Sequence, residues 1–71
     1  MTGEAISVIV NGEPRKLPPD VSLLELLRHL ELDPRVVVVE LNREIVRRPA
    51  LEGTTVRDGD RVELVHFVGG G

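Results

Sequence analysis

The stretch SLLELLRHL, residues 22–30, decides the fold of this 71-residue chain. Ser22 and Glu25 form an S-x-x-E capping box, in which each side chain bonds to the backbone amide of the other residue. Leucines then recur at the i, i+3, i+4 and i+7 spacing that places one apolar stripe along a helix. They are Leu23, Leu26, Leu27 and Leu30. We expect an amphipathic helix of about three turns, ended by Asp33-Pro34 because the residue before proline disfavours the α conformation.

A β-hairpin is predicted before this helix. Residues 6–10 (ISVIV) are mostly β-branched and apolar, as strand residues are. Asn11-Gly12 follows, and both residues tolerate the positive φ angles of a two-residue type I′ turn. The chain then returns through Pro14 to Leu17 as a second, shorter strand. We expect that strand at the edge of a sheet, because proline cannot donate to a ladder.

A second hairpin is predicted after the helix. Residues 36–41 (VVVVEL) are the most strand-like run in the chain. Asn42-Arg43 makes a tight turn, and residues 44–46 return as a short strand. Residues 50–57 are expected to form an irregular connection to the last part of the chain.

A final strand over residues 61–67 follows the turn signal Asp58-Gly59-Asp60. The order is therefore hairpin, helix, hairpin and strand, and one leucine-striped helix must cover one face of a single sheet. We expect an α+β, two-layer β-grasp (ubiquitin-like) fold, with one mixed sheet of about four to five strands packed on one main helix. A single domain is expected over residues 1–71, with a flexible glycine tail over residues 68–71.

The composition excludes several classes of function. The chain has no cysteine, so a disulfide framework, a thiol nucleophile and a cysteine metal site are impossible. Its two histidines, His29 and His66, are too few for a metal site, and we expect His66 to pack at a strand end. The net charge of −3 and the single aromatic residue argue against nucleic acid as a partner. No secretory leader or membrane-spanning run is evident, so we expect a cytoplasmic protein without a membrane partner.

The C-terminal glycines Gly69, Gly70 and Gly71 point to chemistry at the chain end. A free carboxylate is a poor acyl donor, because it is anionic and has no leaving group. Adenylation by a partner enzyme would supply AMP as a leaving group, which a sulfur nucleophile could displace. Glycine suits a tail threaded into a narrow channel, because it has no Cβ and adopts extended conformations that other residues avoid. The other explanation of the three glycines is an inert, frayed terminus.

Several stretches of the sequence resemble the ThiS/MoaD family of ubiquitin-like sulfur carriers, and within it the ThiS branch. They are VNGEP (10–14), LLELL (23–27), VVELNREIV (38–46), DGDRVE (58–63) and the ending VGGG (68–71). The resemblance covers nearly the whole chain in the right order, and the hairpin motifs and the glycine end are specific only when taken together.

The resemblance implies a reaction cycle at Gly71, the sulfur-carrying residue, with Gly69 and Gly70 as the tail required for activation. A ThiF-like adenylyltransferase would use ATP to adenylate the terminal carboxylate. A sulfurtransferase or cysteine desulfurase would supply sulfur for a thiocarboxylate, and a ThiG-like thiazole synthase would build that sulfur into the thiazole ring of thiamine. The chain itself would be a co-substrate, with no catalytic residue and no bound cofactor.

Strand alternation predicts a docking patch beside the tail. If Val62 and Leu64 face the helix, then Val65 and Phe67 face outward, and Ile9 joins them from the first strand. An exposed apolar patch there would be a docking surface for the activating enzyme. A register slip of one residue would exchange the two faces and place Phe67 in the core.

Three other functions stay open on the sequence. The first is the small subunit of molybdopterin synthase, although Asn11-Gly12 and Glu40-Leu41-Asn42 favour ThiS. The second is a carrier that donates sulfur to tRNA or is conjugated to lysines through the same activated end. The third is a non-covalent ubiquitin-like interaction module with an inert tail. Deletion of Gly70 and Gly71 would leave only this third function intact.

Overall fold

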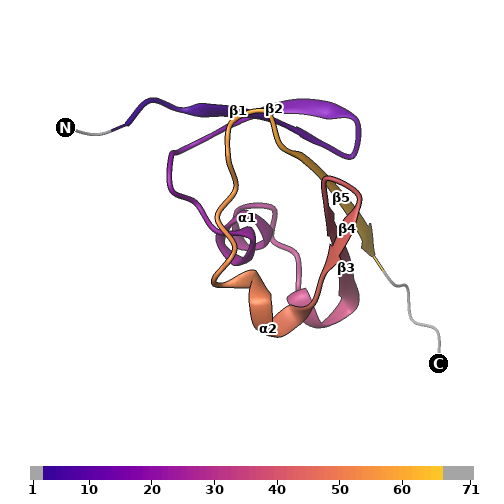
Figure 1. Ribbon diagram of the computed structural model, residues 1–71. Helices are drawn as coiled ribbons and strands as arrows, with labels where there is room; N and C mark the ends of the chain where they lie inside the picture. The colour runs from indigo at the N-terminus through magenta and orange to yellow at the C-terminus, as the bar shows by residue number, and fades with distance from the viewer. Residues whose placement is uncertain (1–2, 67–71) are drawn as a thin grey trace.

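The computed structural model describes residues 3–66, which form a five-stranded sheet with helix α1 lying across one face (Figure 1). In chain order the elements are β1 (Ile6–Val10), β2 (Glu13–Leu17), α1 (Leu23–His29), the 3₁₀ turn η1 (Pro34–Val36), β3 (Val37–Leu41), β4 (Glu44–Val46), α2 (Arg48–Leu51) and β5 (Arg61–His66). The strand order is β2-β1-β5-β3-β4, in which β1 and β5 are parallel and the other neighbours are antiparallel. The predicted two-layer β-grasp with a mixed sheet is confirmed. No helix within residues 3–66 is long and apolar enough to cross a membrane.

Both hairpins turn through two residues with positive φ, which the sequence analysis expected only at Asn11-Gly12. The φ angles are 50° and 83° at Asn11 and Gly12, and 51° and 74° at Asn42 and Arg43. Positive φ at both central residues is the type I′ geometry, whose twist matches that of the flanking strands. β2 lies at the sheet edge as expected, but it pairs with β1 along its whole length and is not the shorter strand. An edge strand accommodates Pro14 because the outer side of that strand has no ladder to join.

The capping box that the sequence predicts opens helix α1. The Glu25 amide donates to Ser22 Oγ at 3.1 Å, and the Ser22 amide donates to Glu25 Oε1 at 2.9 Å. These bonds satisfy two backbone amides that have no partner within the helix itself. The start of α1 is therefore determined by local sequence.

The end of α1 differs from the prediction, because the helix has 7 residues, or about two turns, and stops before Asp33-Pro34. Glu31 takes the left-handed conformation with φ 58°. Its amide donates to the Arg28 carbonyl at 3.0 Å, and the Leu32 amide donates to the Leu27 carbonyl at 2.9 Å. This pair of bonds is the Schellman motif, which usually has glycine where this chain has Glu31. The sequence therefore gives no glycine signal for this helix end.

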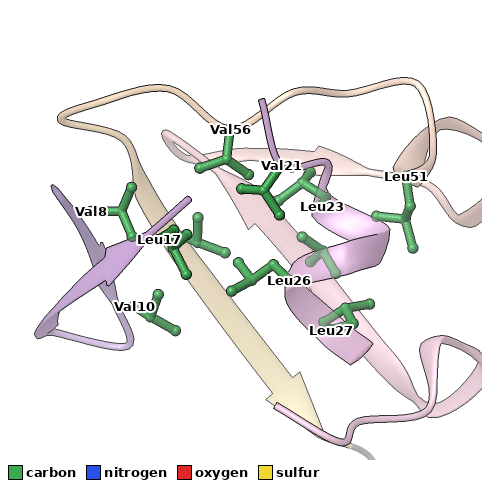
Figure 2. Close-up of a cluster of buried hydrophobic side chains, with 11 residues drawn as sticks. Val8, Val10, Leu17, Val21, Leu23, Leu26, Leu27, Leu51 and Val56 are labelled. Carbon is green, nitrogen blue, oxygen red and sulfur yellow. The ribbon is translucent and has the colours of Figure 1, made fainter. Parts of the chain in front are cut away.

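The core lies between α1 and the sheet face that α1 covers (Figure 2). Leu23, Leu26 and Leu27 on α1 are fully buried, whereas Leu30, the C-cap residue, is half-buried at the edge of the core. The strands contribute Val8, Val10, Leu17, Val39 and Val62 to the same cluster. The leucine stripe predicted from the sequence is thus the helical side of a single aliphatic core.

The connection between β4 and β5 is more ordered than the irregular segment predicted over residues 50–57. It begins with the short helix α2, and Leu51 and Val56 are each only 1 % exposed (Figure 2). The Val56 amide also donates to the Val21 carbonyl at 2.8 Å. Pro49 lies in the first turn of α2, where the missing N–H of proline costs nothing. The connection closes the end of the core beside the start of α1.

The turn η1 is fixed by an exposed ion pair. Asp33 Oδ1 accepts from the Arg35 amide at 2.9 Å, and the guanidinium of Arg35 lies 2.8 Å from the Asp33 carboxylate. Hydrogen bonding to Arg35 lowers the pKa of Asp33 to about 2. The pair orders the entry into β3, although an exposed ion pair adds little to stability.

Candidate functional site

Strand β5 is the last described element before the predicted functional end of the chain. The predicted functional residues Gly69, Gly70 and Gly71 lie outside the described residues. So do the patch residue Phe67 and the whole predicted tail 68–71. The geometry of the site is therefore built from β5 and from the residues that hold it.

The neighbours of β5 hold it unequally on its two sides. Along β3 the pairing is long, running from Val37 opposite His66 to Leu41 opposite Val62. Along β1 the parallel pairing covers only the start of β5, where Ile9 is beside Arg61. On that side the backbone ladder ends at the bond from the Asn11 amide to the Val62 carbonyl, 2.9 Å long.

The side chain of Asn11 continues the contact with β5 where β1 ends. Its Oδ1 accepts from the Leu64 amide at 2.7 Å, and its Nδ2 donates to the Leu64 carbonyl at 3.2 Å. The sequence indicates Asn11 only as a turn residue and does not indicate this contact. No local pattern could have indicated it, because Asn11 and Leu64 are 53 positions apart.

The two faces of β5 have the predicted orientation. Val62 is fully buried and Leu64 is half-buried beneath α1, whereas Val65 on the opposite face is 55 % exposed. His66 is exposed, so the expected packing at the strand end is wrong. It lies at the last pair of the β3–β5 ladder, beyond the buried part of β5.

An apolar cluster lies on the sheet face that α1 leaves uncovered. Val38 is directly opposite Val65, and Ile45 on β4 lies diagonally across from Val38 and is 61 % exposed. We call Val38, Ile45 and Val65 the open-face patch. Val38 was missed because residues 36–39 are all valine, so their sequence shows no alternation between the faces. Ile45 was missed because its place on the face depends on the pairing of β4 with β3.

Ile9 does not belong to this patch, contrary to the prediction. It is half-buried, and the parallel register places it beside Arg61, at the start of β5. Val65 is four positions further along the same strand, which corresponds to about 13 Å at 3.3 Å per residue. Alternation correctly put both residues on one face, but only the register fixes their separation along it.

Two carboxylates adjoin the open-face patch. Glu40 and Glu63 are directly opposite each other in the β3–β5 ladder, and Ile45 is opposite Glu40 on its other side. Like charges in facing positions are unfavourable when no partner covers that face of the sheet. A complementary partner surface would therefore present apolar side chains next to basic groups.

Two shallow depressions adjoin each other on the α1 side of the described part of the chain. Glu25, Arg28 and His29 line the first, and the second shares Glu25 and Arg28 and reaches Asp20 and Glu52. Within residues 3–66, no three His, Asp or Glu side chains lie close enough together to hold a metal ion.

The sheet order, the single main helix and the exposed face of β5 define a ubiquitin-like β-grasp protein. In a comparison with known protein families, residues 8–71 match the family described as ThiS. The chain belongs to the ThiS family. The match includes the terminal glycines and both hairpin turns.

Individual relatives agree with this assignment. The chain is 36% identical over 63 residues to the sulfur carrier protein ThiS of Bacillus subtilis, with 87% of this chain and 96% of that protein covered. The crystal structure of a thiamine biosynthesis protein (ThiS) from Geobacter metallireducens superposes with a TM-score of 0.81 at 40% identity, covering 93% of this chain and 100% of that chain. A thiazole synthase of Paramagnetospirillum magneticum is 39% identical over 66 residues, which is 93% of this chain but only 20% of that protein.

Proposed function

We propose that the chain is a sulfur carrier for the thiazole ring of thiamine, with the Gly71 carboxylate as the group that carries sulfur. The observation that supports this most is the ThiS-family match, which runs to Gly71 itself. The Bacillus subtilis relative has the name of a sulfur carrier, and the Geobacter metallireducens relative that of a thiamine biosynthesis protein. The chain is then a protein co-substrate.

The proposed chemistry has two steps at one carbonyl carbon. A ThiF-like adenylyltransferase joins the Gly71 carboxylate to the AMP part of ATP and releases pyrophosphate. A sulfide equivalent, supplied by a sulfurtransferase or a cysteine desulfurase, then attacks the carbonyl, so that a C–S bond forms as the C–O bond to AMP breaks. The product is a thiocarboxylate and AMP. ATP is used by the partner, and we place the protein in the cytoplasm because this step consumes ATP.

The open-face patch is the proposed docking surface for the activating enzyme. Val65 lies on the strand that leads towards the chain end, and Val38 and Ile45 enlarge its apolar surface. Residues 67–71 span at most about 18 Å when extended. A partner that holds the open face can therefore receive Gly71 in a cleft beside the docking surface.

A ThiG-like thiazole synthase is the proposed acceptor of the sulfur. The supporting observation is the Paramagnetospirillum magneticum thiazole synthase, in which a segment similar to this chain makes up a fifth of the protein. A carrier segment within a synthase chain fits a reaction in which the two work together.

The test is the intact mass of the chain, purified with Gly71 as its free C-terminus. The chain is incubated with ATP, a ThiF-like enzyme and a sulfur source. We expect an oxygen-to-sulfur mass increase that fragmentation localises to Gly71, and loss of that sulfur when thiazole synthase and its other substrates are added. Deletion of Gly71 should abolish the increase. Gly53→Ala is the matched control, because a Cβ at Gly53 meets nothing within 4 Å.

An unchanged mass, with an activating enzyme that loads its own cognate carrier, would refute the carrier function. The glycines would then be an inert end, and the chain would be a non-covalent ubiquitin-like interaction module. A thiocarboxylate that thiazole synthase ignores would keep the carrier chemistry and reject the thiamine pathway.

A further inference from the structure

The side chain of Asn11 bonds to β5, although the turn that contains Asn11 connects β1 to β2. The type I′ turn needs only a residue that tolerates φ 50°, and glycine would meet that need. The side chain nevertheless makes both bonds to Leu64, one as acceptor and one as donor. A carboxamide presents an acceptor and a donor in one plane, as a backbone peptide does. Asn11 therefore substitutes for the next residue of β1 in the ladder with β5.

We propose that Asn11 is a positioning residue for activation of the chain end, because it fixes the C-terminal half of β5 from the β1 side. This inference rests on the proposed carrier function. The residue after Leu64 is Val65, which belongs to the open-face patch, and β5 ends one residue later at His66. With Asn11 in place, Val65 and the end of β5 at His66 are held in a fixed position relative to the rest of the sheet. A partner that binds the open face then receives the chain end in a defined direction.

Asn42 provides an internal comparison, because it occupies the equivalent position of the second hairpin turn. It too has positive φ and two side-chain bonds: its Oδ1 accepts from the Arg61 amide at 3.0 Å, and its Nδ2 donates to Asp60 Oδ1 at 3.0 Å. These bonds hold the start of β5, whereas those of Asn11 hold its C-terminal half. The two asparagines thus have similar local roles at opposite ends of one strand.

Loss of the Asn11 side chain would leave the C-terminal half of β5 held mainly by β3. The residues that precede the terminal segment would then gain conformational freedom, which binding to the activating enzyme must remove. That cost falls on binding, so it raises KM. When the enzyme is saturated with the carrier, the enzyme itself holds the chain end, so kcat is unchanged.

The experiment compares Asn11→Gly with Asn42→Gly. Glycine keeps both turns, because it adopts positive φ freely, and each variant loses two side-chain bonds to the β5 region. Steady-state adenylation is followed by pyrophosphate release with a ThiF-like enzyme, at a temperature where urea titration shows both variants folded. We expect Asn11→Gly to raise KM about tenfold with kcat unchanged, which corresponds to about 1.4 kcal/mol. We expect Asn42→Gly to leave KM within about twofold of the wild type. Its stability should nevertheless fall by about as much as that of Asn11→Gly, because each variant loses two side-chain bonds.

Amide hydrogen exchange gives a readout independent of activation. The Leu64 amide should exchange faster in Asn11→Gly, and the Arg61 amide in Asn42→Gly. Asn11→Asp is the second variant, since it tolerates the same turn and keeps the acceptor for the Leu64 amide but lacks the donor. Its KM should lie between those of the wild type and Asn11→Gly.

Equal KM values for the two glycine variants, with wild-type adenylation intact, would overturn the positioning role and leave the carrier function standing. A fall in kcat alone would also overturn it. Absence of adenylation in the wild type would refute the carrier function itself, and the positioning role with it.

Discussion

The two faces of the sheet carry the same kind of aliphatic residue, but these residues have different roles on each face. On the face that α1 covers, Val39 and Val62 are 1 % and 0 % exposed. On the open face, Val38 and Val65 lie opposite each other, and Val65 is 55 % exposed. The difference between core and patch is therefore the parity of a residue along its strand.

This contrast separates the energetics of folding from those of binding. Fully burying a valine or leucine side chain contributes roughly 1.5–3 kcal/mol to folding. An exposed valine or isoleucine contributes much less, yet its apolar surface stays available to a partner. Two large apolar residues are prominently exposed within residues 3–66, Ile45 and Val65, and both belong to the open-face patch.

The largest effect is expected in the core. Leu26→Ala removes a fully buried side chain from α1 and should lower the free energy of unfolding by about 2–5 kcal/mol. Ile45→Ala on the open face should change it by about 0.5 kcal/mol or less. Urea titration followed by circular dichroism measures both. Comparable losses in the two variants would mean that the faces do not divide the roles.

On the open face, substitutions are expected to impair activation by the ThiF-like enzyme more than they lower stability. The double variant Val65→Ala, Ile45→Ala should raise the KM for the ThiF-like enzyme about tenfold, because apolar contact at the centre of an interface is lost. Its free energy of unfolding should fall by about 1 kcal/mol or less. Lys16→Ala is the control, since Lys16 is exposed on the distant edge strand β2. If Lys16→Ala weakens activation as much, the open-face patch is not the docking surface.

The hairpin turns offer a test that leaves both faces unchanged. Gly12 and Arg43 occupy equivalent positions with φ 83° and 74°, but only arginine is strained there. Arg43→Gly should raise the free energy of unfolding by about 1 kcal/mol, and Gly12→Ala should lower it by a similar amount. Thermal and urea unfolding measure both changes. A loss of stability in Arg43→Gly would indicate that its side chain makes a stabilising contact that outweighs the strain.

The smallest effect is expected at the exposed Asp33–Arg35 pair, away from both faces. The Asp33 carboxyl should titrate at about 2, below its ordinary value of 3.8. Because the folded pKa is the lower one, the pair stabilises the fold above pH 4, and this contribution is lost as pH falls towards 2. Carboxyl chemical shifts measured by NMR against pH give the titration directly. Arg35→Ala should move the midpoint back up, and an unmoved midpoint would reject Arg35 as the cause.

Much of the fold could be predicted because its signals are local. Asn11-Gly12 indicated a type I′ turn, and Ser22 with Glu25 indicated the start of α1, since each needs contacts only with near neighbours in sequence. The early end of α1 was missed because Glu31 occupies a left-handed position that usually signals itself by glycine. The order of residues 50–57 was missed because Leu51 and Val56 are fixed by burial against distant segments.

The sequence by itself determined the order of elements, the alternation that separates the two faces, and the glycine end that suggests activation chemistry. These follow from backbone preferences and side-chain period, which act over a few residues. Only the tertiary structure decided that Val38 and Ile45 join Val65, that Ile9 lies apart, and that Asn11 holds Leu64. Those relations depend on strand order and register, which are set by packing one helix on the sheet and by pairing between segments far apart in the chain.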